Sequence, residues 1–165
     1  MSAGISALLS RENLAFIQQG VSINVASRDV RMVPSLARAM GCRLSDDGSA
    51  LRVSLARPHA RELIRDVERS SALAVVFSQP STHKSLQIKG SDARICSPEE
   101  ADWTRHSDNS AAFAAEIGQL GFSLAFSQCL FAAEPGDLVI IEFTPSQVFE
   151  QTPGPHAGEP LESHP

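Results

Sequence analysis

The stretch Val33–Leu44, V-P-S-L-A-R-A-M-G-C-R-L, decides the predicted fold. As a β-strand it has two unlike faces, because side chains alternate with a period of two. One face carries Arg38 in an otherwise apolar row, and the other carries small residues followed by Arg43. A buried guanidinium needs an anion, and small side chains let a flat molecule or another backbone approach closely. The pattern fits a strand that receives an anionic, partly planar ligand, or equally an edge strand whose arginine bends into water.

The composition predicts one globular domain with a single core. The chain has 165 residues, of which 42% are hydrophobic and 20% charged, a balance typical of such domains. No run approaches the ~18 apolar residues that cross a bilayer, and the N-terminus lacks the pattern of a secretory signal. Cys42, Cys96 and Cys129 form no C-x-x-C pair. We therefore expect reduced thiols in a cytoplasmic protein, with Cys42 and Cys129 in the core.

Charge is distributed unevenly along the chain. All 14 Lys and Arg lie at or before Arg105, where the net charge is +3, and the rest of the chain carries −8, for a total of −5. A nucleic-acid-binding domain is usually basic, so we expect no nucleic-acid partner. Any anion site must be local and lie before Arg105, and the acidic remainder is expected to be solvated or to face a basic partner.

Hydrophobic periodicity predicts six strands connected by turns and helices. The strands cover residues 21–26, 33–44, 51–55, 72–77, 83–95 and 138–143. Helices are expected from the N-cap Ser10 to about Gln19, from Pro58 to Ser70, from a start at Ser97, and over 109–131 with interruptions at Gly118 and Gly121. Residues 1–150 are expected to form the domain. The Pro- and Gly-rich residues 151–165 are expected to be an extended or disordered tail, or an arm that crosses a dimer.

Two further segments are candidates for ligand binding. At residues 56–61, A-R-P-H-A-R, a helix N-terminus beside basic side chains favours a phosphate, although an ordinary solvated helix has the same pattern. On the strand after residue 82, His83, Ser85, Gln87 and Lys89 share one face, which suits a polar heterocycle or simply water. The histidines and cysteines lack metal-ligand spacing, so no metal site is predicted.

The local sequence resembles the pyridoxamine 5'-phosphate oxidase-like, FMN-binding split-barrel family. The resemblance is carried by V-S-I-N-V-A-S, P-S-L-A-R-A-M-G, L-R-V-S-L-A-R-P-H-A-R-E-L-I and A-V-V-F-S-Q-P-S-T-H-K-S-L-Q-I-K-G. It covers roughly residues 17–94, with a weaker match at 138–143. It implies a six-stranded antiparallel split β-barrel with flanking helices, in the α+β class. It also implies a homodimer with FMN in two grooves at the subunit interface.

The resemblance also implies which residues contact the cofactor. Arg38 and Arg43 match the basic positions of the first FMN-contacting strand, and Ser54 matches a hydroxyl on the next. Where the family offers an arginine–lysine pair to the phosphate, this chain has His59 and Ala60, so Arg57, Arg61 or Lys84 would have to substitute. The family's flavin-facing glutamine aligns with Ser85, two residues before Gln87. The implied cofactor-binding residues are Arg38, Ala39, Arg43, Ser54, His59, Ala60, Lys84, Ser85 and Gln87.

The leading functional hypothesis is an FMN-binding homodimer that acts as a flavin-dependent oxidoreductase on an unidentified small molecule. The family's pyridoxamine phosphate oxidases use a late tryptophan and arginine, and this chain has no arginine after Arg105, so vitamin B6 oxidation is not expected. No catalytic acid or base can be named. The alternatives are a non-catalytic module that carries flavin or haem, and a structural dimer whose cofactor site has decayed.

Overall fold

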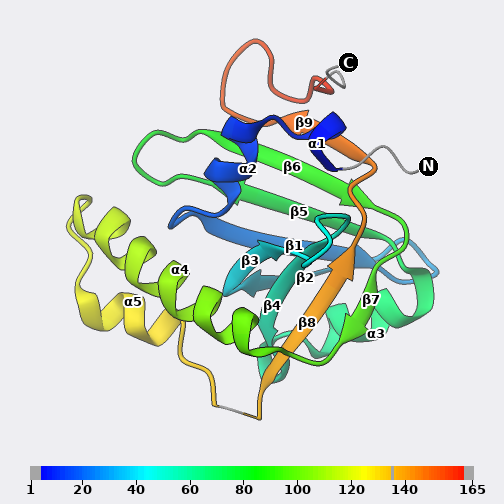
Figure 1. Cartoon of the computed structure of the whole chain (residues 1–165), viewed down its shortest axis with the longest axis horizontal. Helices are drawn as coiled ribbons and strands as arrows, with labels where there is room; N and C mark the ends of the chain where they lie inside the picture. Colours follow the sequence, from blue (N-terminus) through cyan, green and yellow to red (C-terminus); the bar gives the residue numbers. More distant parts are fainter. Residues whose placement is uncertain (1–4, 135, 162–165) are drawn as a thin grey trace.

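The computed structural model describes residues 5–134 and 136–161, which fold into two antiparallel sheets around one core (Figure 1). The five-stranded sheet has the order β2-β1-β5-β6-β9, and the four-stranded sheet has the order β3-β4-β8-β7. The predicted α+β class with antiparallel strands is therefore confirmed. The strands are β1 Ser22–Arg28, β2 Pro34–Ala39, β3 Gly41–Leu44, β4 Leu51–Ala56, β5 Leu73–Ser78, β6 Ser85–Gly90, β7 Arg94–Cys96, β8 Leu138–Phe143 and β9 Gln147–Glu150.

The strand count differs from the predicted six, because two predicted strands each serve both sheets. The predicted strand 33–44 is broken at Met40 into β2 and β3, and 83–95 is broken into β6 and β7. With β9 added, the described ranges contain nine strands. β6 ends at Gly90, where a Cβ atom would lie 2.5 Å from Cδ2 of Phe143, so only glycine allows this close approach to β8. Alternation of polarity continues across such breaks, and it therefore does not reveal them.

The two faces of β2 alternate as predicted, but the face with small side chains is the one that lies inside. Ser35, Ala37 and Ala39 are buried, whereas Leu36 is 69% exposed. Oγ of Ser35 donates a hydrogen bond of 2.6 Å to Oδ2 of Asp66 in the helix packed against it. The small side chains thus make room for a helix and the core. The interpretation that they admit a flat ligand is wrong for this face.

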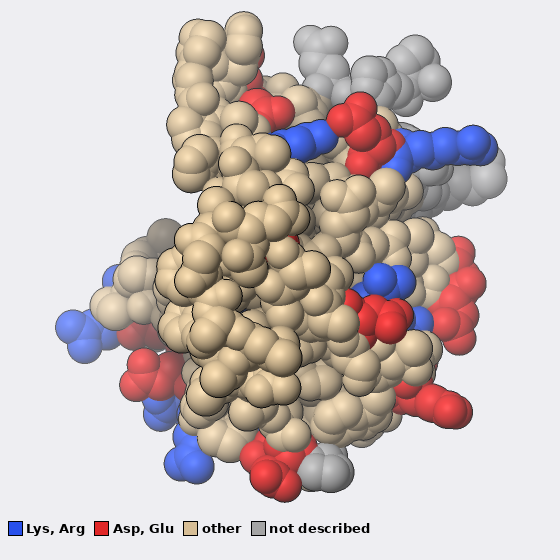
Figure 2. Space-filling view, turned by 90° about the vertical axis from the view of Figure 1, so that its left-hand side faces the viewer, with Lys and Arg blue, Asp and Glu red and all other residues tan. Residues whose placement is uncertain are grey.

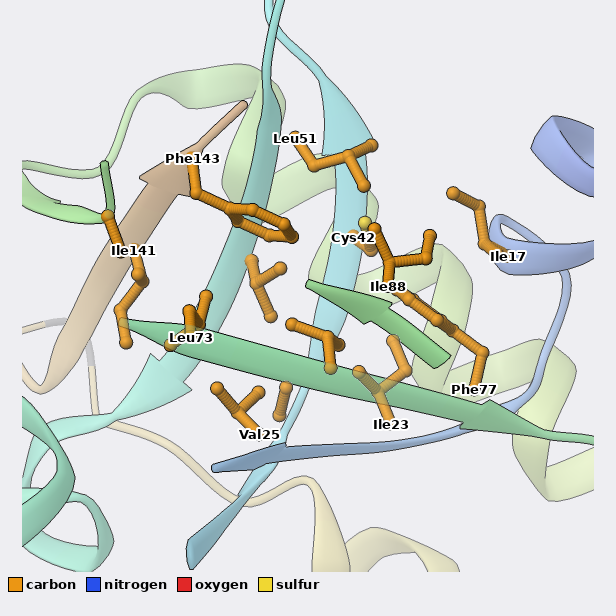
Figure 3. Close-up of a cluster of buried hydrophobic side chains, with 14 of the residues drawn as sticks. Ile17, Ile23, Val25, Cys42, Leu51, Leu73, Phe77, Ile88, Ile141 and Phe143 are labelled. Atoms are coloured by element: carbon orange, nitrogen blue, oxygen red, sulfur yellow. The ribbon is translucent and has the colours of Figure 1, made fainter. Parts of the chain in front are cut away.

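The core fills the space between the two sheets (Figure 3). Val25 and Phe77 of the five-stranded sheet face Ile141 and Phe143 of the other, and none of the four is more than 1% exposed. Burying each such side chain contributes about 1.5–3 kcal/mol to the transfer free energy. Cys42 belongs to this cluster, and burial raises the pKa of its thiol to about 12, so it is unreactive as predicted.

The helices cover the edges and one side of the sheets (Figure 1). They are α1 Ile5–Leu8, α2 Arg11–Ile17, the 3-10 turn η1 Arg57–His59, α3 Arg61–Ser70, α4 Glu100–Gly118 and α5 Leu124–Leu130. Oγ of Ser10 accepts a hydrogen bond of 3.1 Å from the amide of Asn13, which confirms the predicted N-cap. The predicted break after Gly118 separates α4 from α5. Cys129 lies on α5 and is exposed, contrary to its predicted place in the core.

Helix α4 lies against β3 and β4 and begins later than predicted. Its N-cap is Glu99, not Ser97, and Glu99 and Asp102 form a reciprocal capping box. Gly20 fixes the approach of α4 to the N-terminal segment, since a Cβ atom there would lie 2.3 Å from the carbonyl carbon of Ala112. None of the helices in the described ranges is both long and apolar enough to cross a membrane.

The segment after β9 folds back on the five-stranded sheet as far as Leu161. The amide of Gln151 donates to the carbonyl of Ser85 at 2.9 Å, and the amide of Leu161 donates to the carbonyl of Val148 at 2.8 Å. The prediction of an extended or disordered tail is therefore wrong for residues 151–161, because its backbone groups pair with β6 and β9. Residues 162–165 of the predicted tail lie outside the described residues.

Candidate functional site

Three of the predicted cofactor-binding residues share the outer face of the five-stranded sheet, the face that points away from the core. One row across this face contains one residue from each of four neighbouring strands, and each residue lies opposite the next. The row consists of Arg38 on β2, Asn24 on β1, Val76 on β5 and Gln87 on β6. With neighbouring strands ~4.8 Å apart, this row spans about 14 Å. Ser85 lies on the same face of β6, two residues before Gln87. Only strand pairing brings these residues into one row, since they are far apart in sequence.

Arg38 carries a positive charge that no carboxylate among the described residues balances. Its side chain is half-buried, its Nη1 donates to Oγ of Ser22 at 3.0 Å, and its guanidinium lies 5.9 Å from the ring centre of Phe113. Burial lowers its pKa from the ordinary arginine value, but not to a range where it loses its proton. A half-buried guanidinium paired only with a hydroxyl and a ring is suited to bind an anion.

A cavity of about 500 Å³ lies over the neighbouring row of the same face. Its floor includes Ala26, Ala74 and Lys89, which follow one another across β1, β5 and β6. Arg28 also lines it, and none of the described residues that line it is acidic. The volume lies within the ~300–1,000 Å³ typical of small-molecule sites. Small side chains in the middle of the face let a flat ring approach the sheet.

A second basic region surrounds the start of α3. A cavity of about 370 Å³ is lined by Arg57, Arg61, Arg65 and one carboxylate, Asp137. The N-cap residue Ala60 provides no side-chain hydrogen bond, so the first amide groups of α3 are left for another acceptor. These amides, the helix dipole and the three arginines favour a phosphate. Helix α3 packs against β2 on its inner face, where Asp66 accepts the hydrogen bond of Ser35, so the helix lies on the opposite side of this strand from the side chain of Arg38.

The residues predicted at this junction differ in what they can contribute. His59 is exposed at the end of η1, whereas Ala60 is only 2% exposed. Ala60 can therefore offer only backbone groups. The side chains available to an anion are instead those of Arg57 and Arg61, the substitution that the sequence left open.

The structure gives Arg43 a different role from the predicted one. Arg43 is buried beneath α4, where its Nε donates to Oδ1 of Asp102 and its Nη2 to Oε2 of Glu99, both at 2.6 Å. Its charge is already balanced, so it cannot hold a phosphate without breaking these pairs. Ser54 is also buried on this side, with Oγ 3.4 Å from the carbonyl of Gly41. Ala39 faces the core, so neither it nor Ser54 presents a side chain on the outer face.

Arg43 belongs to an ion-pair network that joins α4 to the four-stranded sheet. Arg52 on β4 donates to Oδ2 of Asp102 at 2.8 Å and to Oε2 of Glu142 at 2.6 Å. Burial on its own would raise the pKa of Asp102, but hydrogen bonds from Arg52 and Arg43 outweigh it and lower that pKa. Arg94 pairs with the other oxygen of Glu142. The acidic C-terminal part was predicted to be solvated, yet Glu142 is 8% exposed and serves this network.

Lys84 points to the opposite side of the sheet from Ser85 and Gln87. Its Nζ lies 2.7 Å from Oε1 of Glu12 and 5.0 Å from the ring centre of Phe16, both on α2. Lys84 therefore belongs to the contact with α2 and not to the outer face. Gln87 accepts a hydrogen bond of 3.4 Å from Nε2 of Gln151, which lies after β9.

Two residues of the outer face were missed from the sequence. Asn24 lies in the middle of the row that contains Arg38 and Gln87, and Arg28 lines the cavity. The alternation of V-S-I-N-V-A already placed Asn24 on the polar face of its strand. The sequence does not show the order of the strands in the sheet, in which β1 lies between β2 and β5. No cluster of His, Cys, Asp or Glu suited to a metal ion occurs within the described ranges.

Solved structures with the same architecture were found by comparison of folds. Neither a protein-family model nor a curated protein matches the sequence. HupZ from Group A Streptococcus is similar with a TM-score of 0.54 and 14% identity, covering 91% of this chain and 99% of HupZ. A candidate pyridoxamine 5'-phosphate oxidase from Lactobacillus delbrueckii is similar with a TM-score of 0.54 and 14% identity, covering 87% of this chain and 94% of that one. The chain therefore has the fold of the pyridoxamine 5'-phosphate oxidase-like proteins, which confirms at the level of fold the resemblance seen in its sequence.

Proposed function

We propose that the chain binds FMN as a homodimer, with the flavin on the outer face of the five-stranded sheet. The observation that carries this proposal is the environment of Arg38, which is half-buried and has no carboxylate partner among the described residues. An unbalanced, partly desolvated guanidinium on a ligand-sized surface is costly unless an anion binds there. The shared fold supports the same assignment.

The residues present fit the two ends of an FMN molecule. A flavin is flat and largely apolar, with polar atoms at its edge. Asn24, Ala26 and Val76 give the outer face the shallow surface that such a ring requires, and the amide of Gln87 can both donate to and accept from a polar edge. For the phosphate, Arg57 and Arg61 at the start of α3 take the place of the arginine–lysine pair that this chain lacks.

Bound FMN would supply hydride transfer, and on this basis we propose an oxidoreductase that acts on a small molecule. The protein's own contribution would be to bind and orient. Arg38 would donate hydrogen bonds to the ribityl oxygens or the phosphate, Gln87 would orient the ring edge, and the small residues Ala26 and Ala74 would let the ring lie close to the sheet. No side chain on this face is placed as a proton donor or acceptor for the substrate, so the proposal names no catalytic residue.

An apolar surface beside the site supports the homodimer. Val30, Met32, Val33 and Leu36 are 78%, 67%, 53% and 69% exposed, and they follow one another from the β1–β2 turn into β2. Several large apolar side chains exposed in one turn and the strand that follows it are typical of an interaction surface. A second copy on this surface would remove it from water and cover the neighbouring outer face, and the ligand would then lie at the subunit interface.

The first experiment is an absorbance spectrum of the purified protein, followed by titration with FMN. Flavin bands, or stoichiometric binding of added FMN, are expected. Arg38→Met keeps the apolar stem over Phe113 and should weaken FMN binding about ten- to hundredfold, as expected for loss of a charged hydrogen bond. Arg69→Met, on the exposed end of α3, is the matched control and should bind FMN like the wild type.

The outcomes separate the alternatives. A Soret band without flavin bands would mean that the site holds haem. A colourless protein that ignores both FMN and haem would support a structural dimer with a decayed cofactor site. If FMN binds but Arg38→Met binds it equally well, the assignment to the outer face fails while FMN binding itself stands.

A further inference from the structure

Helices α4 and α5 form a groove that shares no lining residue with the cavity on the outer face of the five-stranded sheet. Its volume is about 360 Å³, in the range of small-ligand sites. It is lined by His106, Ser110 and Ala114 of α4 and by Leu124, Ser127 and Gln128 of α5. None of the residues that line it carries a permanent charge. The groove is therefore suited to a neutral molecule.

Two residues that line this groove each have a polar atom that is buried from water and has no hydrogen-bond partner among the described residues. The two atoms are Oγ of Ser127 and Nδ1 of His106. The Ser127 side chain belongs to a residue that is only 1% exposed. A helical serine can bond the carbonyl four residues earlier, but Ser127 does not do so. Buried polar groups are nearly always paired, so each exception calls for an explanation.

His106 is held in place as an uncharged hydrogen-bonding group. Its ring meets that of Trp103 edge-on at 5.9 Å and lies 6.4 Å from that of Phe131. Burial lowers its pKa below the ordinary histidine value and outweighs a hydrogen bond with the backbone of Met40, which raises it, so the neutral ring is favoured. A neutral imidazole with a free Nδ1 accepts one hydrogen bond in the tautomer that carries its proton on Nε2.

The surroundings of the groove are apolar. The segment 117–133 contains no charged residue, and Figure 2 shows the broad uncharged area on the side of the molecule where α5 and the end of α4 lie. Leu124, which lines the groove, is 63% exposed, and the rings of Phe122 and Phe126 stack beside it in the chain at 5.2 Å. An uncharged apolar ring can thus approach the groove without meeting a charged side chain.

We propose that the groove binds a small uncharged aromatic alcohol, whose hydroxyl accepts a hydrogen bond from Oγ of Ser127 and donates one to Nδ1 of His106. A single hydroxyl has the chemistry to pair with both atoms, since it can donate and accept at once. The ring would lie against Ala114 and Leu124. The groove contains none of the residues proposed to bind FMN, so phenol binding can be tested on the protein without FMN.

The test uses phenol as the probe and the intrinsic fluorescence of the protein as one readout. Trp103 is the only tryptophan of the chain and contacts His106 directly, so binding in the groove should change its emission. Amide shifts in the NMR spectrum should be confined to α4 and α5. Phenol should saturate, toluene should bind about tenfold or more weakly because it lacks the hydroxyl, and benzoate should not bind because its charge would be desolvated without a partner.

Substitutions sharpen this test. Ser127→Ala should weaken phenol binding about tenfold and leave toluene binding unchanged. Ser110→Ala changes the wall of the groove and not its buried hydroxyl, so it is the matched control and should stay within about twofold of the wild type. Because Ser127→Ala removes an unpaired buried hydroxyl, its thermal unfolding should occur at the same temperature or higher.

Three results would overturn the proposal. Phenol could bind no tighter than toluene, or Ser127→Ala could bind phenol like the wild type. Alternatively, Ser127→Ala could unfold at a clearly lower temperature without any ligand, which would show that the hydroxyl has a structural partner in the folded chain.

Discussion

Two groups of arginines in this molecule show how the surroundings of a charge decide its role. Arg43 and Arg52 are 8% and 6% exposed, and each pairs with at least two carboxylates beneath α4. Arg38 is half-buried on the other sheet and has a serine hydroxyl and an aromatic ring in place of a carboxylate. The paired arginines hold the fold together, whereas the unpaired one is available to a ligand. From the sequence, Arg38 and Arg43 were assigned the same task.

The largest expected effect is the loss of Arg52. Arg52→Ala leaves Asp102 and Glu142 buried with fewer partners, and should lower the free energy of unfolding by about 3–5 kcal/mol. Urea unfolding measures this loss. Arg94→Ala removes another partner of Glu142, but the Arg94 side chain is 71% exposed and screened by water, so the loss should be far smaller. Equal losses in the two variants would mean that burial does not distinguish these ion pairs.

The network should also make the protein sensitive to acid through Asp102. Its folded pKa is lowered, mainly because hydrogen bonds from Arg52 and Arg43 outweigh the opposing effect of burial, whereas the unfolded value is about 3.9. The stabilisation by its ionised form is therefore complete above about pH 5 and is lost as the pH falls through the folded pKa. In Asp102→Asn, the free energy of unfolding should fall less steeply between about pH 5 and 3, by at most about 1 kcal/mol over that interval.

Asp108→Asn provides the control for this pH experiment. It removes a carboxylate from an exposed position of the same helix α4. Urea unfolding of all three proteins at several pH values gives the comparison. If the two variants flatten the pH dependence equally, the acid sensitivity does not come from the network.

The third prediction concerns Arg38, the arginine that has no carboxylate partner among the described residues. Arg38→Met without ligand should change the free energy of unfolding by less than about 1 kcal/mol, because no ion pair is broken and the apolar stem is kept. The change could even be stabilising, since a partly desolvated charge is removed. Urea unfolding in the absence of FMN measures it. A loss as large as that of Arg52→Ala would assign Arg38 a structural role and weaken the proposed ligand site.

The smallest expected effect on folding concerns the apolar surface beside Arg38. Leu36→Ser should change the stability of the single chain by less than about 0.5 kcal/mol, because Leu36 is 69% exposed. It should nevertheless weaken self-association in sedimentation experiments. Leu120→Ser, on the uncharged side near α5, is the control, since Leu120 is 48% exposed but lies away from β2. If Leu120→Ser dissociates the protein and Leu36→Ser does not, the dimer forms through the other surface.

Local sequence patterns predicted the elements and several of the site residues. The alternation of V-S-I-N-V-A gave β1 and its polar face, and Ser10 marked the start of α2. The two-faced pattern around Arg38 also appears in β2. These features depend on the period of side chains along a strand and on hydrogen bonds between near neighbours, so they can be derived from the amino-acid sequence alone.

Only the tertiary structure decided which charges are paired and which surface is free. Asp102 lies 59 residues after Arg43 in the sequence. Neither the local sequence of α4 nor that of β3 indicates that the carboxylate of Asp102 contacts the guanidinium of Arg43. The breaks at Met40 and after Gly90 likewise arise from the packing of two sheets around one core, not from a change in the local pattern. Sequence determined where polar and apolar groups fall along each element, because that is a local property. Partners come from contacts between distant segments, and so the roles of Arg38 and Arg43 were separated only by the folded chain.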